Sequence, residues 1–314
     1  MFSPVGVVID AFCAETRRAF QAAFPNQSPD LADVLDTTTR MALEILANTD
    51  AAYHDLEHTL LVTQVGQEIL RGKRVADADV TPELWVEFVV SLLFHDIGYV
   101  RGICRGDRGG RYVIDAQGST AAPPVGATDA WMTPYHVDRG QIFIRERFAG
   151  DRHVDAEAVC RNIELTRFPV PAARDYQGID DFPGLVRAAD LIGQLADPRY
   201  LQKLSRLYAE FRETGEADRR GYRSPADLRE AYPAFYWNLV SPYIPEALRL
   251  LRKTQSGQQV LANLFGHVFE EEHESPAYGP ERRACDDRRR GTEGTRPEAE
   301  RRRTAGRRSA DPDA

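Results

Sequence analysis

Cysteine is scarce in this sequence, and its spacing excludes two familiar roles. The chain has only four cysteines, which lie far apart and form no CxxC pair. A zinc site built from thiolates needs such pairs, and a disulfide framework needs several cysteines in a short chain. We therefore expect ordinary reduced thiols at Cys13, Cys104, Cys160 and Cys285.

Long apolar runs are absent as well. No run approaches the roughly 20 apolar residues that a membrane-spanning helix requires. The opening, MFSPVGVVIDAFCAETRRAF, lacks the basic segment, apolar stretch and cleavage site of a secretory signal. Neither a glycine-rich phosphate loop nor an internal repeat is visible. Because 42% of the 314 residues are hydrophobic, the chain can still bury a core. We predict a cytoplasmic protein without a membrane partner.

Most of the chain is short of positive charge. The net charge is −8, yet residues 281–314 hold 11 arginines against 8 acidic residues, which leaves −11 on the rest. An acidic body argues against a nucleic-acid partner, because such binders need surplus Lys and Arg. The end segment has no Leu, Ile, Val or aromatic residue to offset its ordering entropy. We predict a folded domain at 1–280 and a disordered arginine-rich tail at 281–314. A solvated tail is favoured over one that touches RNA or an anionic surface.

Helical periodicity dominates residues 1–280 and predicts an all-α bundle. Residues 30–48 carry apolar side chains at helical intervals, and residues 52–70 are interpreted as a second helix. Residues 82–97 begin with Pro82 and are apolar nearly all round, as expected of a central buried helix. Further helical patterns cover residues 138–149, 154–165, 183–196, 198–213, 225–232 and 243–271.

One long irregular segment interrupts the helices at residues 99–134. It contains six glycines and three prolines with little periodicity, and "RYVID" within it could form one short strand. Loops of this length are usually lids or binding loops. We expect the segment to cover the mouth of a binding pocket.

Polar residues that can bind metal occur where apolar residues are expected. The stretch AYHDLEHTLLV places His54 and His58 four residues apart, hence on one face of the expected helix. The central helix ends in LLFHDIGY, with His95 and Asp96 adjacent, and Asp190 lies between apolar residues in LVRAADLIGQLADP. Burial of these groups is unfavourable unless something pairs with them, which a divalent cation does well. One site at a helix junction is therefore predicted.

Ordinary structural roles compete with this interpretation. A lone histidine on a helix is more often a satisfied core or surface residue than a ligand, which applies to His153, His267 and His273. Asp190 could pair with Arg187, three residues before it. The ordered combination of a histidine pair, a His–Asp doublet and a later helical aspartate favours the metal site.

That combination resembles the HD superfamily of metal-dependent phosphohydrolases. The superfamily's histidine, His–Asp doublet and later aspartate match His58, His95, Asp96 and Asp190. The resemblance implies an HD-domain helical bundle in which these four residues bind metal. It also implies a metal-dependent phosphoric ester hydrolase.

The segment YHDLEH is similar to the YHNxxH signature of cyclic-nucleotide phosphodiesterases. In that branch the first histidine donates a proton and the second binds metal, which implies a general acid at His54 and makes His54 and Asp96 the catalytic residues. Asp55 stands where the signature has asparagine, and no HPG segment follows the doublet. The substrate therefore stays open among cyclic nucleotides, nucleoside phosphates and other small phosphoesters.

The chemistry of these side chains agrees with the resemblance. Imidazole and carboxylate ligands with open positions suit Mn, Fe, Zn, Co or Ni, and the sequence does not choose among them. Such an ion makes water a nucleophile near neutral pH. An unperturbed histidine pKa of about 6.5 suits a proton donor at His54.

A second ion is implied by the same resemblance. Many HD proteins complete a binuclear centre with a histidine placed like His136, and Asp96 would then bridge two ions. Glu164 occupies an HD-like position for a charged residue near the metal waters. The alternatives are that His136 caps a helix or binds substrate, and that Glu164 is a solvated residue at a helix end.

Four arginines in the glycine-rich loop could bind a phosphate. Guanidinium groups are good bidentate partners for phosphate oxygens, although loops are also charged for solubility. We expect at least one of the four to contact a small, phosphorylated, nucleotide-like substrate. A di-iron oxygenase and a non-catalytic HD sensor remain as other classes, and the oligomeric state is not readable. The arginines are Arg101, Arg105, Arg108 and Arg111.

Overall fold

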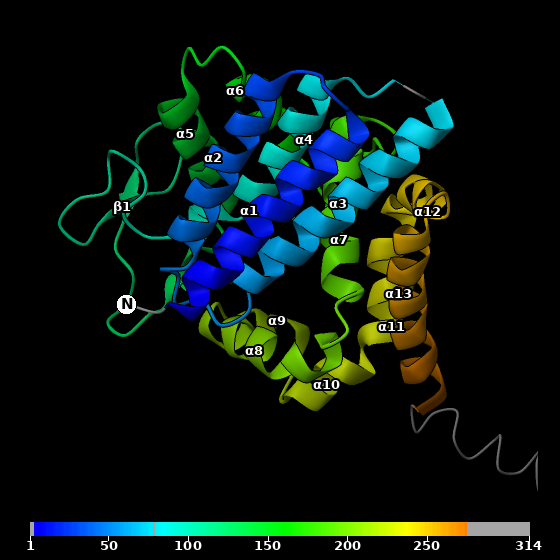
Figure 1. The fold of residues 1–314 in the computed structure, drawn as a ribbon. Helices are drawn as coiled ribbons and strands as arrows, with labels where there is room; N and C mark the ends of the chain where they lie inside the picture. Colours follow the sequence, from blue (N-terminus) through cyan, green and yellow to red (C-terminus); the bar gives the residue numbers. More distant parts are fainter. Residues whose placement is uncertain (1–2, 78, 275–314) are drawn as a thin grey trace, which may run out of the picture. The chain divides into compact units, whose positions relative to one another are not determined.

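The structure, a computed structural model, describes residues 3–77 and 79–274. Helices are the main elements of these residues and strands are almost absent (Figure 1), which confirms the predicted all-α bundle. Described residues up to Glu272 belong to one compact unit. The predicted tail at 281–314 lies outside the described residues. No helix in the described part of the chain is long and apolar enough to cross a membrane.

Short connections join most of the helices. The first half contains α1 (Pro4–Ala23), α2 (Pro29–Leu46), α3 (Leu56–Asp77), α4 (Pro82–Phe94), η1 (Ile97–Tyr99), β1 (Tyr112–Val113), β2 (Thr120–Ala121), η2 (Asp129–Met132), α5 (His136–Phe148) and α6 (Ala156–Glu164). The second half contains η3 (Arg174–Tyr176), α7 (Phe182–Leu195), α8 (Tyr200–Glu213), α9 (Glu216–Arg220), α10 (Pro225–Glu230), α11 (Tyr232–Phe235), η4 (Tyr236–Val240), η5 (Ser241–Tyr243), α12 (Pro245–Leu251) and α13 (Gln255–Glu274).

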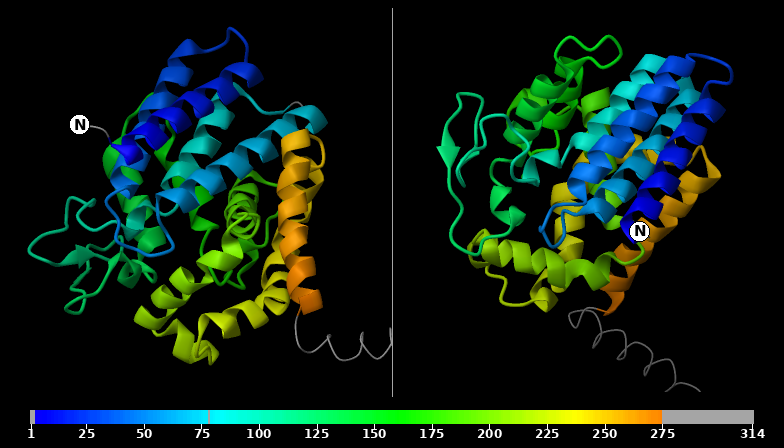
Figure 2. Two further views of the ribbon diagram at one scale, coloured as in Figure 1. Left: turned by 60° about the horizontal axis from the view of Figure 1, so that its bottom comes forward. Right: turned by 60° about the vertical axis from the view of Figure 1, so that its left-hand side comes forward.

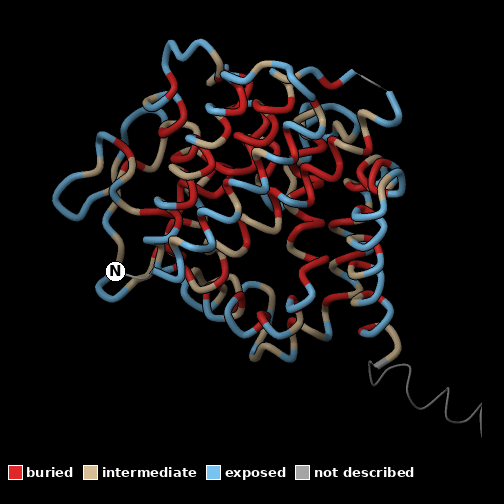
Figure 3. The backbone as a smooth tube through the Cα atoms, in the orientation of Figure 1, coloured by how far each residue is buried: buried red, intermediate tan, exposed pale blue. Residues whose placement is uncertain are grey.

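Helices α3, α4 and α7 form the centre of the bundle. Helix α4 begins at Pro82, with the Thr81 hydroxyl accepting from the Leu84 amide, and its apolar side chains are buried all round. Helices α1 and α2 cover one side, α5 and α6 another, and α12 packs against α3. Buried residues gather where the central helices pass one another (Figure 3). The all-round apolar pattern of α4 thus placed it correctly at the core.

Some predicted boundaries were wrong. The pattern at 243–271 forms two helices, α12 and α13, because the chain turns at residues 252–254. The expected helix at 82–97 ends at Phe94, so the His–Asp doublet follows α4. Helix α1, the first in the described chain, was not among the predicted helices.

Helices α3 and α7 cross closely because glycine lies at their contact. A Cβ atom added to Gly193 on α7 would stand 2.7 Å from the Cα atom of Val62 on α3. Backbone cannot move aside as a flexible side chain can. His58 is four residues before Val62, and Asp190 three before Gly193, so this contact sets the distance between two predicted ligands.

We expect Gly193→Ala to destabilise the protein by about 1–3 kcal/mol, the usual cost of overpacking a core. The helices must separate, so metal affinity should fall as well. Denaturant unfolding and metal titration measure the two effects. Gly266→Ala, at an exposed position of α13, is the control, since a Cβ there meets nothing within 4 Å. It should leave metal binding unchanged and stability equal or higher. Similar stability for both variants would contradict the close-contact argument.

The segment 99–134 contains a small hairpin, whose first strand lies within the RYVID stretch and whose second strand was not predicted. Strands β1 and β2 pair antiparallel, with Tyr112 opposite Ala121, and the hairpin projects from the side of the bundle (Figures 1 and 2). The returning chain comes back to the helices, where the Thr128 amide and hydroxyl donate to Glu213 at the end of α8. Whether the segment acts as a lid over a pocket stays a prediction.

A buried ion pair anchors this segment to α5. The Asp107 carboxylate accepts from Arg139 and from the amides of Gly102, Cys104 and Val113. Arg139 is fully buried and also donates to backbone carbonyls of the segment and of η1. The long loop is therefore organised by one aspartate and one arginine, although it looks irregular in sequence.

Asp107→Ala should lower the free energy of unfolding by about 3–5 kcal/mol, because it leaves the Arg139 charge buried without its partner. Arg108→Ala, which removes an exposed side chain from the same loop, should change stability by less than about 0.5 kcal/mol. Urea unfolding of both variants measures the difference. Equal stabilities would show that the ion pair does not hold the loop.

Candidate metal centre

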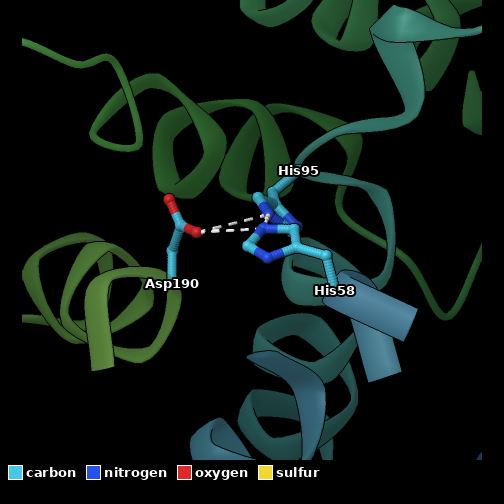
Figure 4. Close-up of side chains that lie close together, drawn as sticks. All are labelled: His58, His95 and Asp190. Carbon is cyan, nitrogen blue, oxygen red and sulfur yellow. Dashed lines mark hydrogen bonds and ion pairs between the residues drawn. The ribbon is translucent and has the colours of Figure 1, made fainter. Parts of the chain in front are cut away.

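Three separate elements bring metal-type ligands together. His58 comes from the first turns of α3, His95 and Asp96 follow the end of α4, and Asp190 projects from α7. In Figure 4 the imidazoles of His58 and His95 face the Asp190 carboxylate. One ligand atom each from His58, His95 and Asp190 lies within 4.8 Å of the others. The predicted convergence of these residues is confirmed.

The turn after α4 orients the histidine of the doublet. The Nδ1 atom of His95 lies 2.7 Å from the Leu92 carbonyl oxygen. A carbonyl can only accept, so Nδ1 carries the proton and Nε2 presents its lone pair to the cluster. His95 is 1% exposed and Asp96 is also buried.

The spacing of the ligand atoms fits a single small cation. The Asp96 Oδ2 atom lies 3.3 Å from His58 Nε2 and 3.2 Å from His95 Nε2. The Asp190 Oδ1 atom lies 3.4 Å and 3.6 Å from the same two nitrogens. Ligands at 2.0–2.2 Å from a tetrahedral ion lie roughly 3.3–3.6 Å apart. His58, His95 and Asp190 could therefore hold a metal ion. Together with Asp96, which lies against both imidazoles, we call them the ligand cluster (His58, His95, Asp96 and Asp190).

The cluster also has the electrostatics of a cation site. The Asp96 Oδ2 atom is buried and makes no hydrogen bond within the described residues. Burial alone would lower the pKa of His95, but Asp96 and Asp190 outweigh it and raise that pKa well above its usual value. The same excess of negative charge, next to an orphaned carboxylate oxygen, is what a divalent cation neutralises.

One side of the cluster is open to solvent. The His58, His95 and Asp96 side chains are at most 6% exposed, whereas Asp190 is 19% exposed. His54, whose ring lies 5.5 Å from that of His58, is 18% exposed. Solvent therefore reaches this region at Asp190 and His54 more readily than at the other ligands.

His54 does not lie on α3, which corrects the prediction of one helix through both histidines. Residues 52–55 form bends, and α3 begins at Leu56. The Asp55 carboxylate accepts from the His58 amide, as an N-capping side chain does. The rings of His54 and His58 still lie 5.5 Å apart, because the chain turns tightly into the helix.

Glu210 on α8 holds His54 and was not found from the sequence. Its Oε2 atom lies 2.6 Å from His54 Nδ1, and its Oε1 atom accepts from the amides of Tyr53 and His54. Burial alone would lower the pKa of His54, but the Glu210 charge and hydrogen bond outweigh it and raise the pKa to about 9. The pair leaves His54 Nε2 as the free nitrogen.

His136, the first residue of α5, lies on the other side of Asp96. Its Nε2 atom is 3.8 Å from Asp96 Oδ1, and its Nδ1 atom is 2.7 Å from the Thr133 carbonyl. Burial, despite the Asp96 charge, lowers the pKa of His136, which favours the neutral ring that a metal ligand needs. Asp96 thus faces His58 and His95 with its Oδ2 atom and faces His136 with its Oδ1 atom.

The predicted substrate-binding residues make contacts elsewhere in the described chain. Arg101 pairs with Asp129 and Asp50, Arg105 bonds to Glu146, and Arg111 bonds to Thr120. Arg108 is exposed, and its backbone pairs with that of Arg111. A role for these arginines in phosphate binding stays a prediction.

Glu164 and Arg187 are both engaged in structural contacts. Glu164 accepts from Gln141, Arg167 and Tyr176, so its predicted place near metal waters stays a prediction. Arg187 donates to the carbonyls of Tyr176 and Gly178. The alternative in which Arg187 pairs with Asp190 is therefore wrong.

The cysteines that the structure describes are free thiols, as predicted. Cys13, Cys104 and Cys160 are free and buried, while Cys285 lies outside the described residues. His267 bonds through Nδ1 to the Leu195 carbonyl, which is the satisfied structural role expected of a lone histidine.

Fold and site together define the class of this protein. It is an all-α protein with a buried histidine–aspartate cluster that could bind a metal ion. The chain belongs to the Npun_R2479-like family, whose sequence profile matches residues 2–274. No curated protein and no solved structure matches the chain. The matched region contains the whole ligand cluster, His54 and His136.

Proposed function

We propose that the protein is a metal-dependent phosphohydrolase of the HD type. The observation that carries the proposal is the ligand cluster, in which the Nε2 atoms of His58 and His95 each lie 3.2–3.6 Å from one oxygen of Asp96 and one oxygen of Asp190. Of these, the buried Asp96 Oδ2 has no hydrogen bond in the described residues. A cation bound there would act as a Lewis acid and activate water at neutral pH.

Either one or two ions fit this proposal. His58, His95, Asp96 and Asp190 would hold the first. The Asp96 Oδ1 atom and the His136 Nε2 atom, 3.8 Å apart, would hold a second, with Asp96 as the shared carboxylate. Nitrogen and oxygen ligands suit Mn, Fe, Zn, Co or Ni.

His54 would donate the proton that the leaving oxygen requires. Glu210 accepts from Nδ1 and so fixes which nitrogen points outward. Nε2 can then carry a proton at the open side of the ligand cluster. An oriented donor of this kind serves a hydrolase, whereas an oxygenase has less use for it. The Glu210–His54 pair therefore favours hydrolysis over the di-iron oxygenase.

The substrate would be a small phosphoester, with cyclic and linear nucleotides as the leading class. Asp55 caps α3, a role that the asparagine of the phosphodiesterase signature could also fill. The departure at Asp55 therefore keeps the local geometry on which the resemblance rests. Contact of the substrate with Arg101 or Arg111 would require their present pairs to open.

Metal analysis followed by a substrate screen tests the proposal. The purified protein should contain a transition metal and, with Mn or Fe supplied, should release phosphate or open a cyclic ester in a panel of nucleotides and simple phosphoesters. A chelator should abolish the activity. Metal-dependent oxygen consumption without hydrolysis would instead identify an oxygenase. Absence of metal after reconstitution with every candidate ion would leave a non-catalytic protein.

A further inference from the structure

Tyr99 lies between two histidines next to the ligand cluster, His54 beside His58 and His136 beside Asp96. Its ring is 4.7 Å from that of His54 at an interplanar angle of 10°, and 4.5 Å from that of His136 at 21°. Both contacts are parallel stacks, and Tyr99 is 2% exposed. We call this arrangement the three-ring stack (His54, Tyr99 and His136).

The chain around Tyr99 fixes it in this place. A Cβ atom added to Gly98 would clash with the backbone carbonyl of His136, so glycine lets η1 lie directly against the start of α5. His136 Nδ1 donates to the Thr133 carbonyl, and the side chain of Thr133 lies beside the Tyr99 hydroxyl. Tyr99 and His136 are thus both next to the same residue.

A histidine held through one nitrogen can still pivot about that hydrogen bond. His54 is held through Nδ1 by Glu210, and His136 through Nδ1 by Thr133. In each case the free Nε2 atom would swing as the ring turns. A flat ring packed on the face of each imidazole blocks this rotation.

We propose that Tyr99 is a positioning residue that fixes the ring planes of His54 and His136 together. This inference rests on the proposed function, in which His54 donates a proton and His136 holds a second ion. One tyrosine ring then orients both the proton donor and the second-ion ligand. The planar ring, which stacks on both imidazoles, provides this positioning.

Histidine-ring NMR tests the stack without any activity. In the wild-type protein, metal-free or loaded with zinc, ring protons of both His54 and His136 should be shifted upfield by the Tyr99 ring. Spectra of His54→Ala and His136→Ala assign the signals. Ordinary shifts for both histidines in the wild-type protein overturn the proposal, whatever the variants do.

Two substitutions at Tyr99 distinguish a residue that orients the histidine rings from one that only fills space. Tyr99→Phe keeps the ring and should keep the upfield shifts and the affinity for a second equivalent of Co²⁺. Tyr99→Met fills similar volume without a planar face. It should lose the shifts at His54 and His136, leave the His58 and His95 signals in place, and weaken the second Co²⁺ equivalent by about 10–100-fold, the usual effect of an outer-shell partner.

Kinetics then link the stack to catalysis. Tyr99→Met should lower turnover of an alkyl phosphoester more than that of a nitrophenyl ester, and Tyr99→Phe should restore the wild-type ratio. If Tyr99→Met and Tyr99→Phe behave alike in the NMR and Co²⁺ measurements, the positioning role is wrong. If the wild-type protein hydrolyses no phosphoester, the proposed function fails, while the NMR and Co²⁺ results still decide the role of Tyr99.

Discussion

Replacing His95 by alanine is expected to remove the metal from the protein. His95 is 1% exposed, the Leu92 carbonyl fixes its Nδ1, and its Nε2 faces Asp96 and Asp190. Loss of an outer-shell partner lowers metal affinity about 10–100-fold, and loss of a buried ligand should exceed that range. Elemental analysis after dialysis measures retained metal, and turnover should fall with it.

The free energy of unfolding of the wild-type protein and of His95→Ala gives an independent test of metal binding. An ion present at about 100 times its dissociation constant stabilises the folded state by about 2.7 kcal/mol. A chelator should therefore destabilise the wild-type protein and leave His95→Ala unchanged. His153→Ala is the matched control, because His153 lies outside the ligand cluster. Retained metal in His95→Ala, or equal loss in His153→Ala, would contradict the assigned site.

The ligand cluster could be predicted because its residues conflict with their surroundings. His95 and Asp96 end an apolar helix, and Asp190 interrupts another. Each conflict has many explanations alone, but one cation at a helix junction resolves all of them. The structure adds the distances and the orphaned Asp96 oxygen, which no sequence pattern encodes.

Glu210 could not be found in the same way. It belongs to the amphipathic helix α8, where acidic residues are ordinary, and 156 positions separate it from His54 in the sequence. Its side chain is nevertheless buried. Only the tertiary packing of α8 against the start of α3 shows that its carboxylate faces a histidine.

Asp55 carried a signal that the sequence interpretation overlooked. Helical periodicity alone favoured one helix across residues 52–70, which would have placed His54 one turn above His58. An aspartate directly before an apolar run is also a common N-cap. Interpreting Asp55 as an N-cap would have started the helix at Leu56 and left His54 in the preceding turn, where the structure has it.

The function of the long segment 99–134 could not be predicted from its composition. Its glycines and arginines suggested a phosphate-binding loop, yet Arg101 and Arg111 bond within the protein. Arginine composition does not distinguish a guanidinium that awaits a ligand from one that ties a loop together. Asp107, which organises the segment through Arg139, has no feature in the sequence that separates it from other loop aspartates.

His54→Ala should keep its metal and lose roughly 10²–10⁴-fold in turnover on an ester with a poor leaving group, the usual contribution of general acid catalysis. The metal is retained because the ligand cluster does not include His54. The loss should shrink for a nitrophenyl ester, whose leaving group scarcely needs a proton. Steady-state kinetics with both substrates and elemental analysis of the variant measure these expectations.

Glu210→Gln separates the proton donor from the group that holds it. The glutamine side chain is similar in shape to glutamate but lacks the charge that raises the pKa of His54. Its carbonyl oxygen can still accept the two backbone N–H groups that Glu210 now accepts. We expect a loss in the same direction as His54→Ala, smaller in size and again greatest for the poor leaving group. His95→Ala, in contrast, should lose both activities together with the metal. Equal losses on the two esters in His54→Ala would refute the proton-donor role, and oxygen consumption by the iron-loaded protein would point to an oxygenase.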